Sequence, residues 1–122
     1  MAATAITNTV LKRNEAKAMP TAATVAKTDG ALVTFDKDDQ KILLLLKNNV
    51  TNATHTAVIK AGNGLQGVSD LEVTLAEGAE SCVVVESGRF MNVSGNNKGK
   101  VNIVSKDTTT GTQIEVRAIV LP

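Results

Sequence analysis

The sequence is poor in aromatic residues, with no tryptophan, no tyrosine and two phenylalanines, Phe35 and Phe90. Proteins that bind sugars or single-stranded nucleic acids commonly stack their ligands on aromatic rings. A chain with two rings offers little surface of that kind, so both classes of binding protein are poor hypotheses.

An excess of charge is also lacking. The chain has 13 Lys and Arg residues against 12 Asp and Glu residues, which gives a formal net charge of +1. Nucleic-acid-binding domains carry a strongly positive field, because contacts with phosphates require lysine and arginine. We therefore expect no nucleic-acid partner.

Chemically reactive side chains are scarce, since Cys82 is the only cysteine and His55 the only histidine. A lone cysteine excludes a disulfide within the chain and is compatible with a reducing cytoplasm. Because Cys82 precedes three valines, we expect it to be a buried, small hydrophobic residue. A nucleophile and base pair would have to use His55, since activation needs a base within hydrogen-bond reach. We therefore expect no enzyme, no catalytic residue and no cofactor, and we keep a small enzyme built on His55, Cys82 and a glycine-rich loop as a hypothesis to be tested.

Long hydrophobic segments are missing as well. The first residues have neither a charged start nor an apolar stretch of seven or more, so we predict no signal peptide, no transmembrane helix and no membrane partner. The longest aliphatic run, Ile42–Leu46, lies between Lys41 and Lys47. It is too short for a bilayer, which needs about 20 residues, and fits a strand of about 5 or 6.

This run predicts a central strand. Successive side chains of a strand point to opposite faces, so an unbroken aliphatic run must be covered on both sides. The alternating segments Leu71–Leu75 and Ile114–Val120 supply one cover. The other could come from the N-terminal segment or from a second protein, and the sequence leaves that choice open.

The 122 residues form one domain of ordinary size, which buries roughly 65% of its unfolded surface. From residue 35 to residue 122, short apolar segments alternate with turns rich in Gly, Asn and Thr. This pattern predicts an all-β domain, an antiparallel β-sandwich or barrel of about seven to eight short strands. Residues 1–34 have a different, Ala- and Thr-rich texture and are expected to form an extended N-terminal arm with a weak strand. Within the arm, the segment before Pro20 favours either a marginal helix or extended chain with a turn at Asn14.

Two motifs imitate ligand sites. Gly62–Gly67 matches the G-x-G-x-x-G string of dinucleotide-binding folds, but the residues after it alternate like a strand, whereas that fold needs a helix there. The acidic residues Asp36, Asp38 and Asp39 lack the glycine and glutamate that a calcium loop would require. We therefore predict a tight glycine loop, a solvated acidic turn and no metal.

Several stretches resemble a known family. The similar segments are Phe35-Asp36, Asp39-Gln40-Lys41, Lys47-Asn48-Asn49, Ala61–Val73, Glu86–Gly95, Lys98–Val101 and Ile114–Leu121. Together they cover about 90 residues as a loose pattern, and they resemble the small β-sandwich decoration (cement, head-stabilising) proteins of tailed bacteriophage capsids.

This resemblance implies a structural protein that binds the outer surface of an assembled capsid, often around local threefold positions, and stabilises contacts between capsomers. The implied partner is the major capsid protein, and we expect a homo-oligomer, a trimer in particular, on the capsid surface of the virion after synthesis in the bacterial cytoplasm. The best interface anchors among the residues are Arg13, Arg89 and Phe90, because arginine and aromatic residues are enriched in binding hot spots. The alternative function is a virion fibre or tail β-sandwich that contacts host surface glycans.

Overall fold

The computed structural model describes residues 4–25, 30–36, 38–49, 53–106 and 114–122, and for residues 23–25 it describes the backbone only. These residues form ten strands, one 3-10 turn, η1 (Asp39–Lys41), and one short helix, α1 (Ser87–Phe90). In this part of the chain no helix is long and apolar enough to cross a membrane.

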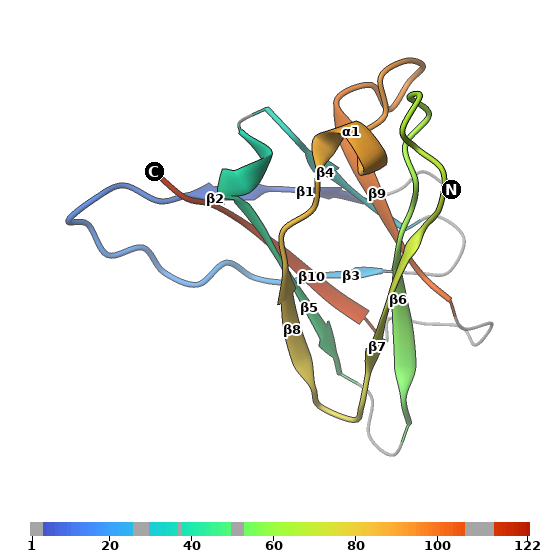
Figure 1. Ribbon diagram of the computed structural model, residues 1–122. Helices are drawn as coiled ribbons and strands as arrows, with labels where there is room; N and C mark the ends of the chain where they lie inside the picture. The colour runs from blue at the N-terminus through green and yellow to red at the C-terminus, as the bar shows by residue number, and fades with distance from the viewer. Residues whose placement is uncertain (1–3, 26–29, 37, 50–52, 107–113) are drawn as a thin grey trace.

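The strands form two open sheets that share one core (Figure 1). Sheet A has the order β1 (Thr4–Ile6), β4 (Ala31–Thr34), β9 (Lys100–Ser105), β6 (His55–Ile59), β7 (Leu71–Leu75). Sheet B has the order β2 (Asn8–Val10), β10 (Ile114–Val120), β5 (Ile42–Asn48), β8 (Glu80–Val83), with β3 (Ala23–Val25) beside β2 on β10.

The predicted all-β sandwich is confirmed, and the free sheet edges show that it is not a closed barrel. Most strand pairs are antiparallel, as predicted, and two short pairs, β1 with β4 and β2 with β10, are parallel. There are more strands than predicted because residues 4–25 contribute three strands of three residues each. Alternation over three residues is too short a signal to separate from the Ala- and Thr-rich background.

The predicted central strand is β5, which lies between β10 and β8. It pairs with β10 along its whole length, from Ile42 opposite Val120 to Asn48 opposite Ile114. Its inward side chains are fully buried against those of sheet A. The core residues of the two sheets with no exposed surface include Ile42, Leu44, Leu46, Ile114, Val116, Ala118, Ala31, Val33, Ala57, Ile59, Val101 and Ile103.

The outward face of β5 is half-buried, and the chain itself supplies part of the cover that the sequence left open. In the register, Leu45 lies between Arg117 of β10 and Cys82 of β8. The Arg117 Nε donates to the backbone oxygen of Pro20 at 2.9 Å, and its Nη1 lies 3.4 Å from a carboxylate oxygen of Glu80 on β8. To reach from β10 to β8, the arginine side chain has to cross β5 over Leu45.

The N-terminal residues join both sheets, because β1 belongs to sheet A and β2 to sheet B. Between β2 and β3 the chain leaves the sandwich as an extended excursion, residues 11–22, which we call the projecting loop (Figure 1, blue, at the left). Its turn lies at Asn14, whose φ of 62° is a conformation that asparagine tolerates. Of the two alternatives, extended chain with a turn at Asn14 is therefore the one adopted. The boundary between arm and sandwich domain at residue 34 stays a prediction.

The predicted burial of Cys82 is wrong, because this residue is exposed. The valine run after it is not one buried strand, since β8 ends at Val83 and alternates between half-buried and exposed side chains. Its pairing with Leu45 places Cys82 on the outward face of sheet B, at the edge strand.

Asn48, the last residue of β5, is fully buried and connects three segments at the end of the sandwich opposite α1, which we call the lower corner. Its Nδ2 donates to the backbone oxygens of Ala53, Leu75 and Ala76 at 2.8, 3.1 and 3.3 Å. One side chain thus fixes the end of β5, the chain before β6 and the end of β7.

Candidate docking surface

Three segments distant in sequence gather at the upper end of the sandwich in Figure 1. They are the loop 61–70 between β6 and β7, helix α1, and the loop 91–99 that leads into β9. We call them together the apical platform. Backbone hydrogen bonds join them, since the Gly62 nitrogen donates to the oxygen of Arg89 at 2.9 Å and the Met91 nitrogen to that of Ser87 at 2.9 Å.

Glycines allow the close backbone contacts of the platform. A Cβ atom at Gly62 would lie 2.3 Å from the backbone oxygen of Met91, and one at Gly67 would lie 1.9 Å from that of Gly62. Real Cβ atoms do not approach backbone oxygens so closely, so the loop closes on itself and on Met91, the residue after α1, only because these residues have no side chain. The predicted tight glycine loop is confirmed, and so is the strand, β7, that follows it.

Asn63 clamps the two long loops together. Its Oδ1 accepts from the Val93 nitrogen at 2.8 Å, and its Nδ2 donates to the Ser94 oxygen at 3.1 Å. Both hydrogen-bonding ends of the amide are used, so the loops 61–70 and 91–99 are held in one relative position.

Two carboxylates fix the base of the platform, Asp39 from below α1 and Asp70 at the closed ends of the loop 61–70. Asp39 accepts from the backbone nitrogen of Ser87, the first residue of α1, at 2.8 Å. Asp70 accepts from the Ala61 nitrogen at 2.7 Å and from the Lys60 ammonium at 3.0 Å. The backbone N–H of Ser87 lowers the pKa of Asp39, and that of Ala61, followed by Lys60, lowers the pKa of Asp70, because these donors favour the ionised carboxylates.

The platform displays aliphatic side chains to solvent. Leu65 is as exposed as in an extended chain, at 103%, while Val68 is 79% and Val93 48% exposed. Leu65 and Val68 border a shallow hollow of about 550 Å³ together with Gln66, Glu86 and Arg89. Scattered surface aliphatics are ordinary, but here three lie on loops fixed by their own hydrogen bonds. The platform can therefore present a preorganised apolar contact with charged groups at its rim.

The three predicted anchors lie in different places. Arg89 borders the hollow, with its guanidinium 5.0 Å from the centre of the Phe90 ring and its Nη2 3.5 Å from the Ser69 hydroxyl oxygen. Phe90 is 3% exposed and belongs to the core, so its ring supports Arg89 from below and is not displayed. Arg13 is exposed at the turn of the projecting loop, and this loop lies away from the platform in Figure 1.

The residues of the enzyme hypothesis are not brought together. His55 is buried at the start of β6 and faces inward from sheet A, since it pairs with the buried Leu75. Cys82 points outward from sheet B. Of the acidic cluster, Asp38 accepts from the Gln40 nitrogen at 3.1 Å and Asp39 holds α1. No group of three or more potential metal ligands occurs within the described ranges.

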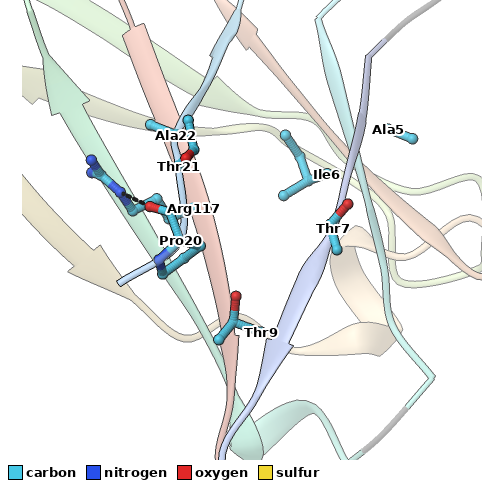
Figure 2. A pocket seen from close by; sticks show the side chains of 8 residues that line it. All are labelled: Ala5, Ile6, Thr7, Thr9, Pro20, Thr21, Ala22 and Arg117. Carbon is cyan, nitrogen blue, oxygen red and sulfur yellow. Dashed lines mark hydrogen bonds between the residues drawn. The ribbon is translucent and has the colours of Figure 1, made fainter. Parts of the chain in front are cut away.

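A second pocket, of about 350 Å³, lies between the N-terminal strands and the returning end of the projecting loop (Figure 2). Arg117 is its one charged residue, and Figure 2 shows its Nε bonded to Pro20. Aliphatic and hydroxyl groups make up the rest of the lining, which comes from Ala5, Ile6, Thr7, Thr9, Pro20, Thr21 and Ala22. Neutral threonines and an arginine that is already bonded provide no evident acid, base or nucleophile, so this pocket is a packing gap beside the loop.

Leu65, Val68 and Asn63 were missed as site residues by sequence reasoning. The sequence does contain a signal for Leu65 and Val68. Each is a large aliphatic residue that stands alone between glycine and polar residues, outside any alternating pattern, and such a residue has no core strand or helix to belong to. Asn63 gives no such signal, since asparagine before glycine is typical of any turn.

The fold and the platform together define a small β-sandwich with a fixed aliphatic surface at one end. Comparisons with protein-family models, with curated proteins and with solved structures found no match.

Proposed function

We propose that the protein is a non-enzymatic decoration protein of a tailed-phage head, which docks on the outer surface of the assembled capsid and stabilises contacts between capsomers. In this proposal its partner is the major capsid protein and its location is the capsid surface of the virion. The observation that carries the proposal is the apical platform, with Leu65 and Val68 exposed on loops that glycine contacts and Asn63 hold in place.

A preorganised aliphatic surface suits repeated docking on a shell. Loops already fixed before binding lose little conformational entropy when they dock, so more of the contact energy appears as affinity. Burying Leu65 and Val68 would contribute about 3–6 kcal/mol. A nanomolar site requires about 12 kcal/mol, so further contacts have to supply the rest.

The projecting loop is the proposed source of those contacts. Residues 12–19 are exposed, and among them Lys12, Arg13 and Lys17 outnumber the single acidic residue Glu15. An extended, basic segment of this kind fits along a neighbouring subunit, where it could add to an exposed sheet edge. A protein that touches one subunit with its platform and a second with its loop resists their separation by the free energy of its own binding.

We further propose that the protein acts as a homo-oligomer on the shell, a trimer in particular, because copies around a local threefold position would each reach a different subunit. Three linked docking surfaces also raise the effective affinity, since binding of the first surface brings the others close to their sites.

The test is to mix the purified protein with undecorated capsids and to image the particles. Ordered additional density at every equivalent position, with the platform against the shell, is the expected result. Bare shells after incubation at tens of micromolar protein would refute the proposal. A parallel glycan array addresses the fibre alternative, in which a strong sugar hit without shell binding would replace the present proposal.

A further inference from the structure

Strand β8 is a free edge of sheet B. β5 pairs with one side of it, and no other described strand pairs with it, since β7, which precedes it in the chain, belongs to sheet A. The exposed side chains at this edge are those of Glu80, Cys82 and, just beyond the strand, Val84, which is 51% exposed. The outward face of the edge strand is therefore open to solvent at Glu80, Cys82 and Val84.

The hydrogen bonds of β5 fix which backbone groups of β8 point outward. The Asn48 nitrogen at the end of β5 donates to the Ala79 oxygen, just before β8, at 3.0 Å. Toward β10, the odd-numbered residues of β5 are bonded, since the Leu121 nitrogen donates to the Lys41 oxygen at 2.7 Å. Hydrogen-bonded residues alternate along an antiparallel pair. In β8, residues 79, 81 and 83 therefore bond to β5, and the N–H and C=O groups of Glu80 and Cys82 point away from the sheet.

Apart from its short length of four residues, this edge carries none of the usual protection against pairing. Natural edge strands are blunted by lysine, proline, bulges or inward charges. Residues 80–84 contain no lysine and no proline, pair without a bulge, and hold one charge, Glu80, which already lies 3.4 Å from Arg117. The β-branched residues Val83 and Val84 favour an extended partner at this place.

We propose that two copies of the chain pair through their β8 edges, antiparallel and about a twofold axis at Cys82. In this register the Cys82 residues exchange both backbone hydrogen bonds, and Glu80 of each copy lies opposite Val84 of the other. The two glutamates then lie at opposite ends of the contact, so like charges do not meet. A parallel arrangement would instead align them.

The pairing continues sheet B across the two copies. It also joins the outward apolar strips formed by Leu43, Leu45 and Cys82, which are half-covered or exposed in one copy alone. A twofold contact of this kind uses the same patch on both copies and closes at two. It therefore describes the free protein and is separate from a trimer on a threefold position of a shell.

Sedimentation velocity over a concentration series, under reducing conditions, tests the pairing. The wild type is expected to pass from monomer to dimer and to stop there. Cys82→Pro removes an outward N–H that the sheet does not use, and prolines are tolerated at such edges. Cys82→Lys places two like charges next to each other at the twofold axis, and lysine is the residue with which natural edge strands prevent pairing. Each variant should weaken the dimer by at least about tenfold, whereas Cys82→Ser, the matched control, should dimerise like the wild type.

Thermal unfolding of each variant shows whether it is folded, and Cys82→Lys keeps the test valid if the proline variant is not. A monomer at all concentrations, a species larger than a dimer, or unchanged association of the folded Pro and Lys variants would overturn the proposal. No capsid enters this assay, so its failure leaves the decoration function untouched.

The register has its own test. Cα atoms of a hydrogen-bonded antiparallel pair lie about 5.5 Å apart, so a short thiol-to-thiol crosslinker should join Cys82 to Cys82 in the wild-type dimer. The matched control moves the only thiol to the exposed β7–β8 turn, as Glu77→Cys in the Cys82→Ser background, and should not crosslink. A dimer that crosslinks equally at both positions would contradict this register.

Discussion

Replacing Asn48 with alanine should lower the free energy of unfolding by about 2–4 kcal/mol. The side-chain amide has two N–H hydrogens for three backbone oxygens, and the nearest, that of Ala53, lies at 2.8 Å. Each net hydrogen bond contributes about 1 kcal/mol, so the two N–H hydrogens account for about 2 kcal/mol. The cavity that the amide leaves at this fully buried position adds the remainder. Asn48→Asp should cost more than alanine, because a carboxylate would face the same oxygens without a hydrogen to donate.

Urea denaturation at 25 °C measures this effect, and an unchanged dependence on urea would show that the unfolded state is the same. The matched control is Asn49→Ala, since Asn49 is exposed and, among the described residues, its amide donates to the Glu115 carboxylate alone, at 3.2 Å. We expect the control to change stability by less than about 0.5 kcal/mol. If Asn48→Ala fell within that same range, the assignment of Asn48 as the tie of the lower corner would be refuted.

Three further predictions concern the platform and the outward face of sheet B. Gly67→Ala should cost about 1–3 kcal/mol, because its Cβ would collide with a backbone oxygen, whereas Gly64→Ala in the same loop has ordinary contacts at 3.5 Å and should be neutral. Folding lowers the pKa of Asp70, so its ionised carboxylate stabilises the fold at pH values above the ordinary pKa, near 3.8. This stabilisation should disappear as the pH falls below that value, because the unfolded chain binds the proton more tightly. Asp70→Asn should therefore make the melting temperature less dependent on pH in acid. Arg117→Met should cost about 1–2 kcal/mol in urea, through its bond to a backbone oxygen, while Lys106→Met, which breaks an exposed ion pair, should cost less than about 0.5 kcal/mol.

The strands of the core could be predicted because their signal is long and local. Ile42–Leu46 is an unbroken aliphatic run, and Ile114, Val116 and Ala118 alternate with Glu115 and Arg117 before the apolar end Ile119-Val120, so period and length both indicate strands. Both segments are in fact the paired central strands of sheet B.

The platform could not be predicted, because it depends on contacts between residues far apart in the chain. Asn63 bonds to residues 30 and 31 positions away, and Asp39 bonds to Ser87, 48 positions away. Neither asparagine before glycine nor an aspartate in a polar turn indicates which distant N–H it will meet. The local chemistry was predicted as turns, and the assembly of these turns into one surface is a tertiary property.

The error at Cys82 has a similar origin. A cysteine before three valines suggests burial by composition, but burial in a strand depends on which face a residue takes. The register with β5 places Cys82 outward, and the edge position of β8 leaves it uncovered. The short strands of residues 4–25 were missed because they are held by pairing with β4 and β10 and not by a pattern of their own.

The central claim is that the apical platform docks on a capsid, and the most direct measurement is the affinity of platform variants for undecorated shells. Leu65→Ser should weaken binding by about 10- to 150-fold, because the leucine side chain no longer leaves water on docking. Leu121→Ser is the matched control, since Leu121 is also exposed, at 40%, but lies outside the platform. The account predicts a large loss for Leu65→Ser and wild-type affinity for Leu121→Ser, and equal affinities of both variants and the wild type would contradict it.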